Sequence, residues 1–431
     1  MIRRLHRPPA GARPVRTEAR STLHIAVRGS RVDDVRLELP EPADDFEALL
    51  RGRAHTEPPD LTARIRGSCP VAQRMTACRA VEDACGAVVD GPLADLRRLL
   101  HCGEWIRSHA LHVHLLHAPD FLHLPDALAL ARTRPDLLQR GLRLRNAGNE
   151  IVELLAGPAP HPANVRVGGF RRLPDRAELD RLRAVLRQAR GDAESTLAWV
   201  GGFEFPDLAI GHELLALRGS GGYAIDSGVL WSSRIGAFTV ADFEQHVHRR
   251  RVPGSASLYA ELDGRRYLTG PLARWSLNSA LLPAEVRAAA DAAGLGPTCD
   301  NPFRGILVRA AEVLWAVVEA RHLIERYVPP RVPAVPVEPR AGVGHGATEA
   351  PPGLLYHRYE LAADGTVLGA TVVPPTTQNL AAVESDLRDV VQARPDLDDA
   401  ELTRRCERAV RSYDPGIACA AHFLDVTVER S

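Results

Sequence analysis

Lysine is absent from this chain, so all 54 of its strongly basic residues are arginines. They are balanced by 54 aspartates and glutamates, which makes the formal net charge zero. A neutral chain has no long-range field that would favour nucleic acid or an anionic membrane surface. Abundant arginine, alanine, proline and glycine are typical of a GC-rich genome, so clusters of arginine are weak evidence for phosphate recognition here.

Long apolar runs are also missing. No window reaches the roughly 18 consecutive apolar residues of a membrane-spanning helix, so we expect no membrane span. Residues 1–9 are cationic but are not followed by the apolar stretch of a secretory signal. Seven cysteines, an odd number without the spacing of a small disulfide scaffold, favour a reducing, cytoplasmic location.

Helical periodicity dominates what is present. Residues 23–39 predict two short strands joined by a turn at 28–31. Apolar residues at three- and four-residue spacing then predict helices. Residues 303–327 are apolar around most of the helical circumference, which indicates a buried central helix. The other helices are expected at residues 70–85, 93–116, 125–144, 177–188, 380–393 and 398–412. The predicted fold class is mainly α with small peripheral β-sheets (α+β).

Two short segments near the ends of the chain carry a recognisable pattern. Residues 64–70 read Arg-Ile-Arg-Gly-Ser-Cys-Pro, and residues 414–422 read Asp-Pro-Gly-Ile-Ala-Cys-Ala-Ala-His. The pair resembles the metal-binding motifs of the large (alpha) subunit of nickel–iron hydrogenases, in the soluble multisubunit branch linked to nicotinamide or deazaflavin cofactors. Further matches follow the family's order along nearly the whole chain. They lie at residues 16–18, 46–53, 101–121, 161–170, 301–304 and 374–379.

The resemblance implies a bundle of long helices around a bimetallic site, to which each segment supplies Cys-x-x-Cys. The second cysteine of each pair is present as Cys69 and Cys419, at the positions that bridge nickel and iron in the family. Arg66 and Gly416 replace the two thiolates that bind nickel alone. Glycine offers no ligand, and the guanidinium of arginine repels a divalent cation. We therefore do not expect nickel to bind in the family manner, and the metal site is degenerate.

Three interpretations of Cys69 and Cys419 stay open. They hold iron or another altered metal centre, they pack as small hydrophobic residues at a former site, or they form a reversible disulfide. Arg66 either supplies positive charge that favours the thiolates or faces a channel or solvent. Glu18 stands at the family's proton-relay position, and its alternative role is an ion-pair partner for Arg66.

Glu47 and His422 form a second constellation. The resemblance implies that these positions help to hold a structural magnesium ion together with water. A hydrogen bond between the two side chains without metal is the alternative. Active family members are commonly cut just after this histidine by a nickel-sensing protease. Residues 423–431 alternate apolar and polar side chains as a strand does, and an unmetallated site predicts that they are retained.

Other positions are expected to be structural. Pro352 stands where the family has an arginine that packs over the diatomic ligands of iron, so that donor is missing. The remaining histidines and cysteines of helical segments are expected to serve packing and hydrogen bonding. They include His101, His109, His112, His117, Cys78 and Cys85.

Between residues 328 and 353 the composition shifts to proline, valine, glycine and alanine. Clustered prolines and glycines predict an extended loop rather than a helix. A disordered linker between domains is one interpretation. A loop that wraps the surface of a single unit, residues 1–431, is favoured because the motifs on its two sides must meet in space.

The leading functional hypothesis is a hydrogenase-like large subunit that cannot bind nickel normally and works in an electron-transfer hetero-oligomer. Because no cysteine spacing for iron–sulfur clusters is present, electrons would pass through an iron–sulfur small subunit, with diaphorase-type subunits as further partners. The alternative is a redox or hydrogen-activating enzyme with an altered iron or other metal centre at Cys69 and Cys419. A stand-alone thiol or metal-storage protein is the third hypothesis.

Overall fold

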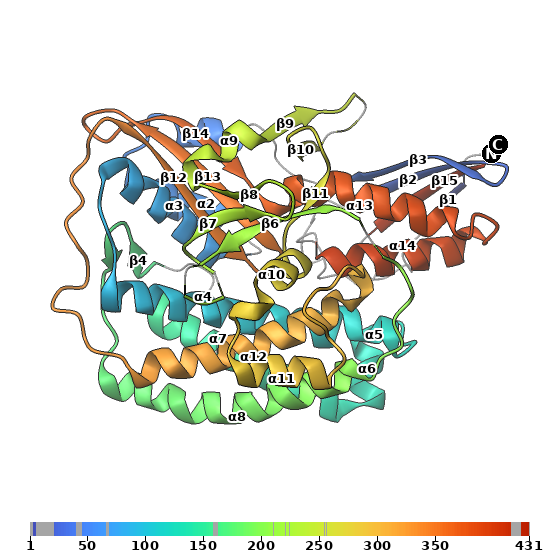
Figure 1. Cartoon of the computed structure of the whole chain (residues 1–431), viewed down its shortest axis with the longest axis horizontal. Helices are drawn as coiled ribbons and strands as arrows, with labels where there is room; N and C mark the ends of the chain where they lie inside the picture. Colours follow the sequence, from blue (N-terminus) through green and yellow to red (C-terminus); the bar gives the residue numbers. More distant parts are fainter. Residues whose placement is uncertain are drawn as a thin grey trace, which may run out of the picture.

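The computed structural model describes residues 3–5, 21–39, 45–65, 69–157, 163–209, 211–219, 221–223, 225–253, 255, 257–414 and 424–430. Long helices form one layer, which lies below the sheets in Figure 1. Helix α12 packs against both α4 and α8, and α4 packs against α7. These four helices are α4 (Gly91–Leu111), α7 (Pro135–Ala156), α8 (Arg176–Gly201) and α12 (Gly305–Glu325).

Helix α12 is the buried central helix that the sequence predicts. Its apolar side chains surround the axis because neighbouring elements meet it on several sides. Arg309 and Glu312 are nevertheless buried within it, at 0% and 1% exposure. Buried charges are tolerated only when they are paired and hydrogen-bonded, so these two side chains point to a polar network inside the protein.

Helix α4 continues beyond its last α-helical turn. The chain widens into the π-helix η1 (His112–His117) and then enters α5 (Ala118–Phe121). A π-helix forms hydrogen bonds between residues five apart, so such residues lie on neighbouring turns. The rings of His112 and His117 accordingly meet edge to face, with centroids 5.3 Å apart.

Helix α3 (Pro70–Cys85) packs on a three-stranded antiparallel sheet. The sheet has the order β12 (Gly342–Ala350), β13 (Gly353–Leu361), β14 (Val367–Val373). The predicted loop over residues 328–353 is therefore wrong for residues 342–350. Gly344 and Gly346 lie within this strand. They are glycines because a Cβ atom at either position would collide with the α3 backbone at Ala80 or Thr76. These glycines let the helix lie directly on the strand.

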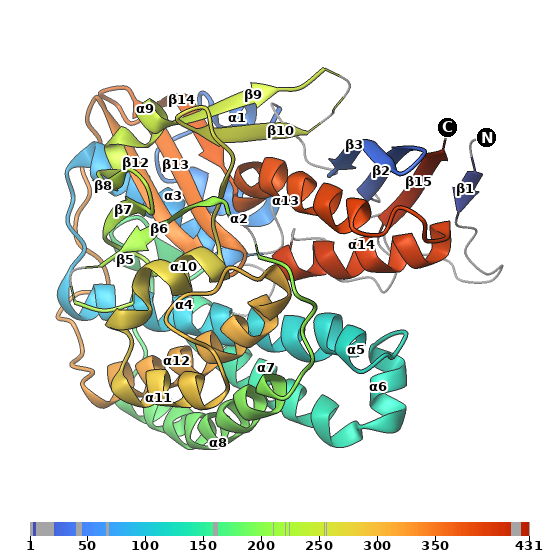
Figure 2. The ribbon, with the colours of Figure 1, turned by 45° about the vertical axis from the view of Figure 1, so that its right-hand side comes forward.

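A second sheet, of four strands, contains both ends of the chain. Its order is β1 (Arg3–Leu5), β15 (Leu424–Arg430), β2 (Ser21–Arg28), β3 (Arg31–Glu38). The hairpin β2–β3 confirms the strand pair predicted from residues 23–39. Helices α13 (Pro375–Gln392) and α14 (Asp399–Tyr413) pack beside this sheet, as Figure 2 shows.

The remaining elements complete the periphery. A mixed sheet has the order β11 (Tyr267–Leu268), β6 (Glu213–Arg218), β7 (Val229–Ser232), β8 (Gly236–Phe238). Two small hairpins are β4 (Val165–Arg166) with β5 (Gly169–Phe170), and β9 (Val247–Arg251) with β10 (Leu258–Leu262). The short helices are α1 (Asp45–Leu50), α2 (Pro58–Ile65), α6 (Ala127–Thr133), α9 (Phe243–His246), α10 (Pro271–Asn278), α11 (Ala284–Ala292) and the 3₁₀ turns η2 (Val240–Asp242), η3 (Ser279–Leu281) and η4 (Pro302–Arg304).

The predicted class, mainly α with small peripheral sheets, is confirmed. Within the described ranges, none of the helices has the length and apolar character needed to cross a lipid bilayer.

Candidate metal centre

Two of the six predicted site residues fall within the described ranges. Cys69 and Glu47 are described, whereas Glu18, Arg66, Cys419 and His422 lie outside the described residues. The geometry of the centre is therefore built from Cys69 and from the segments that lead into the C-terminal motif.

Cys69 occupies the N-cap position of α3 and is 5% exposed. It packs in a small apolar cluster with Ala72 from the same helix, Ala350 at the end of β12 and Leu355 in β13. The thiol is thus seated where the first turn of α3 meets the β12–β13 turn, shielded from water.

A buried carboxylate fixes this first turn. Glu104 of α4 accepts hydrogen bonds from the backbone N–H groups of Val71 and Ala72, each at 2.9 Å. These are N–H groups that a helix leaves without intrahelical partners, and the carboxylate also suits the positive end of the helix dipole. Burial raises the pKa of Glu104, while Arg107 and the two N–H groups oppose that shift. Glu104 therefore holds the backbone directly after Cys69 in place.

The turn between β12 and β13 lies against a buried arginine from α10. Arg274 donates to the carbonyl oxygens of Ala350 at 2.9 Å and Pro351 at 3.0 Å. The next residue, Pro352, has no side-chain donor, as the sequence indicates. A guanidinium nevertheless reaches this turn, from a helix that the sequence motifs do not mark.

Arg274 is held in turn by two buried carboxylates. It makes a two-pronged pair with Glu312, at 2.8 and 2.9 Å, and contacts Glu349 at 3.1 Å. Its guanidinium lies 4.3 Å from the Trp105 ring centroid, and Tyr223 donates to Glu312 at 2.8 Å. Burial works against both charges, but their attraction raises the pKa of Arg274 and lowers that of Glu312. The network is fully hydrogen-bonded around a rigid ion pair.

Arg309 of α12 joins this turn to the C-terminal segment. Its guanidinium lies 3.5 Å from the carbonyl oxygen of Pro351, 3.4 Å from that of Ser412 and 3.9 Å from a carboxylate oxygen of Asp414. Burial lowers the pKa of Arg309, and the negative charge of Asp414 opposes that shift; a Cys69 thiolate would oppose it as well. One buried guanidinium therefore joins the β12–β13 turn, against which Cys69 packs, to the end of α14.

Asp414 marks the point where α14 ends. Its φ of 50° lies in the left-handed region, which is uncommon for a residue other than glycine. Non-glycine residues in this conformation cluster at functional sites, where surrounding contacts hold them. Asp414 is also the first residue of the second motif, residues 414–422.

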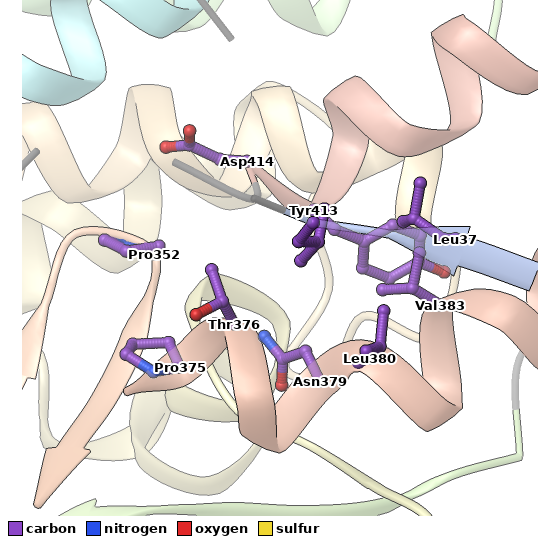
Figure 3. A pocket seen from close by; sticks show the side chains of 10 residues that line it. Leu37, Pro352, Pro375, Thr376, Asn379, Leu380, Val383, Tyr413 and Asp414 are labelled. Carbon is purple, nitrogen blue, oxygen red and sulfur yellow. The ribbon is translucent and has the colours of Figure 1, made fainter. Parts of the chain in front are cut away.

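A narrow cavity runs beside this turn. Figure 3 shows Pro352, Pro375 and Thr376 toward one end, and Leu37 and Val383 toward the other. Its volume is about 10 Å³, room for roughly one water molecule. The lining is mainly apolar and the volume is small, so this cavity has no room for a ligand larger than water. The other lining residues are Leu39, Asn379, Leu380, Tyr413 and Asp414.

Glu47 lies away from Cys69, on α1. Its carboxylate pairs with Arg249 at 2.7 Å and accepts the backbone N–H of Val372 at 2.8 Å. Its predicted companion, His422, lies beyond the described residues. In the described part of the chain, Glu47 is thus an ion-pair partner, and its role as a magnesium ligand stays a prediction.

The buried histidines of α4 and η1 have structural contacts. His109 lies 3.0 Å from Glu312, and His112 bonds to the carbonyl oxygen of Arg411 at 2.8 Å. Since a carbonyl can only accept, His112 carries its proton on Nε2. Burial lowers the pKa of His101 and His109 to about 4 and that of His112 to about 3. These buried side chains are therefore neutral near pH 7.

Among the described residues, no three histidine, cysteine, aspartate or glutamate side chains gather as a metal-binding group. Sequence reasoning also missed the most central polar residues, Arg274, Arg309 and Glu312. The sequence did contain a signal for Arg309 and Glu312, which are charged residues within the otherwise apolar helix α12. A charged side chain in such a helix is rarely buried without a partner. Arg274 carried no such signal, since α10 is short.

The comparisons with known proteins agree with this architecture. Residues 45–139 match the family model described as nickel-dependent hydrogenase. The chain is 29% identical to the alpha subunit of sulfhydrogenase 1 from Pyrococcus furiosus, over 95% of this chain and 96% of that protein. It is 28% identical to the alpha subunit of sulfhydrogenase 2 from the same organism, over 95% and 97%.

Solved structures give the same result. The chain superposes on a subunit of an NAD⁺-reducing [NiFe]-hydrogenase in the H₂-reduced state with a TM-score of 0.82 and 25% identity, covering 91% of this chain and 94% of that one. A [NiFeSe]-hydrogenase of Dm. baculatum matches with a TM-score of 0.72 and 20% identity, over 92% and 96%, which shows a shared fold.

Proposed function

We propose that this chain, which is similar to the large subunits of nickel-dependent hydrogenases, is a member of that family whose centre does not hold nickel in the family manner. The observation that carries the proposal is the donor set. Arg66 and Gly416 occupy the positions of the two thiolates that bind nickel alone. Without them, half of the soft ligands that nickel requires are missing, and a permanent positive charge stands in their place.

Under this proposal, buried charged residues of the chain hold the backbone segments around the centre in place. Glu104 fixes the backbone after Cys69, while Arg274 and Arg309 hold the β12–β13 turn and the end of α14. Glu18, at the family's proton-relay position, is proposed to pair with Arg66. These contacts do not depend on a metal, which supports a scaffold that persists after nickel binding is lost.

As a subunit, the protein is proposed to act in an electron-transfer hetero-oligomer in the cytoplasm. The two curated relatives are each named as an alpha subunit, which supports partner chains for this protein too. An iron–sulfur small subunit would carry the electrons, with diaphorase-type subunits as further partners. No cluster-binding cysteine spacing in the sequence supplies that function within this chain.

Elemental analysis of the complex purified from its natural host tests the proposal, with partner chains identified in the same sample by mass spectrometry. We expect nickel well below one atom per chain and an iron–sulfur protein among the partners. Stoichiometric nickel together with hydrogen turnover would refute the loss of the nickel site. Purification of the chain without any partner would refute the hetero-oligomer.

A second candidate function is a redox or hydrogen-activating enzyme with an iron or other altered centre at Cys69 and Cys419. The observation that favours it is the environment of Cys69, which is buried at the N-cap position of α3 and is followed by backbone N–H groups that Glu104 holds in place. A bound iron with cyanide or carbonyl ligands would give infrared bands in their characteristic region. Cys69→Ser should abolish both the bands and the iron, whereas Cys78→Ser, in the same helix, should leave them unchanged.

Glu47 and His422 are proposed to hold a structural magnesium ion. The Glu47 carboxylate already receives Arg249 and the Val372 N–H, so a metal would have to share it or displace the arginine. Arg249→Met should therefore preserve or increase magnesium content, while Glu47→Gln should lower it. If neither variant changes the magnesium content, Glu47 serves the ion pair alone.

A further inference from the structure

Three electron-rich rings meet inside the protein. Trp105 of α4, Trp315 of α12 and Tyr223, which follows β6, form this aromatic triad, and each is at most 1% exposed. The ring centroids lie 5.3 Å apart for the two tryptophans, 5.0 Å for Tyr223 and Trp315, and 6.3 Å for Tyr223 and Trp105. These are contact distances of aromatic pairs, and an electron tunnels readily between rings that touch.

One corner of the triad is joined to the segment that packs on Cys69. The indole N–H of Trp105 donates to the carbonyl oxygen of Glu349 at 2.9 Å. The next residue, Ala350, belongs with Cys69 to the small apolar cluster of the candidate centre. The surroundings of the thiol are therefore coupled to the triad through one hydrogen bond and one residue of β12.

The charges around the triad decide where the loss of an electron is tolerated. The guanidinium of Arg274 lies 4.3 Å from the Trp105 ring centroid, and that of Arg98 lies 5.5 Å from the Trp315 ring centroid. A cation over the face of a ring is attracted to the neutral ring but opposes a positive charge on it. Both tryptophans are therefore harder to oxidise than an indole without such a neighbour.

Tyr223 has the opposite surroundings. Its hydroxyl donates to a carboxylate oxygen of Glu312 at 2.8 Å. Burial and the negative charge of Glu312 raise the pKa of Tyr223, so the phenol is protonated near pH 7. A phenol that loses an electron becomes a strong acid and gives its proton to the carboxylate. The product on Tyr223 is a neutral radical, and burial of a neutral group carries no charge penalty.

We propose that Tyr223 is a redox-active residue that forms a neutral tyrosyl radical, with Glu312 as its proton acceptor and the two tryptophans as the electron relay. In this step the O–H bond of Tyr223 breaks, and its proton forms an O–H bond with Glu312. The electron passes to a one-electron oxidant, which is reduced. Return of one electron and of the same proton restores the phenol.

The oxidant must be of high potential, because the ion pair with Arg274 makes Glu312 a weak base. An oxidised metal ion or a thiyl radical belongs to this class. The radical site depends on the triad and on Glu312 and not on which metal the centre holds. The inference therefore goes beyond the proposed function.

Flash-quench oxidation of the full chain gives the first test. A photoexcited ruthenium polypyridyl complex, quenched by a cobalt(III) ammine, oxidises the protein, and frozen samples are measured by electron paramagnetic resonance. We expect a neutral tyrosyl signal that is lost in Tyr223→Phe. The absence of this signal from the natural chain, or a signal that Tyr223→Phe leaves intact, would overturn the proposal.

Tyr259→Phe is the matched control and should keep the signal. The Tyr259 hydroxyl also donates to a carboxylate, that of Glu384 at 2.9 Å. Among the described residues, however, the tyrosine ring that pairs with tryptophans is that of Tyr223. Equal loss of the signal in both variants would contradict a radical located on Tyr223.

A second pair of variants tests the relay. Trp315→Phe removes the indole beside Tyr223 but keeps an aromatic ring there, whereas Trp199→Phe removes an indole that packs on Phe203. Under the same flashes, the yield of the tyrosyl signal should fall in Trp315→Phe and stay unchanged in Trp199→Phe. Equal yields would show that the tryptophans of the triad take no part.

The role of Glu312 is tested against that of Glu349. Both carboxylates are buried partners of Arg274, but it is Glu312 that accepts the Tyr223 hydroxyl. Glu312→Gln should lower the yield of the tyrosyl signal, and Glu349→Gln should preserve it. Equal signals would overturn Glu312 as the proton acceptor. If Glu312→Gln does not fold, Tyr223→Phe, which removes a single oxygen atom, still decides where the radical resides.

Discussion

At the scale of single residues, the centre is organised by buried charges. Arg274 satisfies two carboxylates and two carbonyl oxygens, and Arg309 bridges the β12–β13 turn to the end of α14. Such pairs contribute little net stability compared with an apolar core, but removal of one partner leaves an uncompensated charge. Their value here is geometric, since they fix the segments on which Cys69 and Asp414 sit.

Arg274→Met should therefore destabilise the protein strongly. It leaves Glu312 and Glu349 buried without their main counter-charge, at a cost of about 3–5 kcal/mol in the free energy of unfolding. The midpoint of urea unfolding measures this loss. Arg134→Met, which breaks an exposed pair with Asp136, is the control and should leave the midpoint nearly unchanged. Equal effects would contradict the structural role of Arg274.

The buried histidines predict a stability that falls in mild acid. The pKa values of His101 and His109 are lowered to about 4 by burial, against about 6.5 in an unfolded chain. As the pH falls from 6.5 toward 4, the unfolded state binds protons that the folded state excludes, so stability is complete above about pH 7 and is lost below it. Each histidine should cost about 2 kcal/mol at pH 5 relative to pH 7.

Urea unfolding at pH 7 and pH 5 checks this expectation. His101→Leu removes one titrating group and has no hydrogen bond to break among the described residues, so its stability should fall less steeply with pH. An identical pH dependence in the variant would show that folding does not lower the pKa of His101.

The sequence allowed residues to be assigned to the candidate centre only where they belong to a motif. Cys69 was assigned to the centre by its surrounding pattern, and this assignment stays a prediction. In the structure its side chain packs against Ala72, Ala350 and Leu355. Arg274 and Glu349 were not predicted, because their pairing joins residues 75 positions apart and depends on how α10 meets the β12–β13 turn. Local periodicity contains no information on such distant contacts.

At the scale of elements, the key contact is that of α3 with β12. Cys69 begins α3, and the helix rests on Gly342, Gly344 and Gly346 with no side chains between the two backbones. Any added side chain in this row would lift the helix from the strand. The position of the thiol is consequently set by the strand beneath the helix as well as by Glu104.

Gly344→Ala should disturb this contact. Its Cβ would collide with the backbone of Ala80 and Ala84, where neither helix nor strand has a flexible side chain to move. Overpacking of this kind costs about 1–3 kcal/mol or more. Gly191→Ala in α8 is the control, since nothing lies within 4 Å of its Cβ, and it should stabilise the helix by about 1 kcal/mol. Thermal unfolding of both variants measures the contrast.

Elements with strong helical periodicity were predicted well, and those defined by packing were not. The helix at 70–85 has the predicted bounds. The helix predicted at 125–144 is divided, because Pro135 starts α7 and its predecessor Arg134 takes a non-helical conformation. Strand β12 was predicted to be a loop because its alternating glycines are typical of flexible segments. In the structure these glycines allow the backbone of α3 to lie directly against the strand.

At the scale of the whole molecule, Cys69 and the end of α14 both lie beside the β12–β13 turn, although they are more than 340 residues apart in the sequence. Helix α12 joins this turn to the end of α14 through Arg309. Arg66 and Gly416 lie outside the described residues. The loss of nickel ligands is thus proposed to be local, and the rest of the centre is proposed to remain usable.

The double variant Arg66→Cys with Gly416→Cys tests this view. It restores the family's four cysteines, and we expect nickel content to rise at least tenfold above that of the natural chain when both are produced with the family's maturation proteins. Arg66→Cys alone is the matched control and should give little gain. Unchanged nickel in the double variant would show that the pocket has changed beyond its ligands.

The backbone-on-backbone seating of α3 has a practical meaning for protein engineers. Along Gly342, Gly344 and Gly346 the backbones of strand and helix are in direct contact, and the next residue on this face, Thr348, bonds to Thr76 of α3 at 2.6 Å. The helix that begins at Cys69 and the strand beneath it therefore depend on each other for their positions. A chimera that exchanges only α3 or only β12 with a hydrogenase relative should be destabilised, because the two backbones would no longer fit together. Exchange of residues 69–85 together with 342–350 should preserve the contact and the position of Cys69.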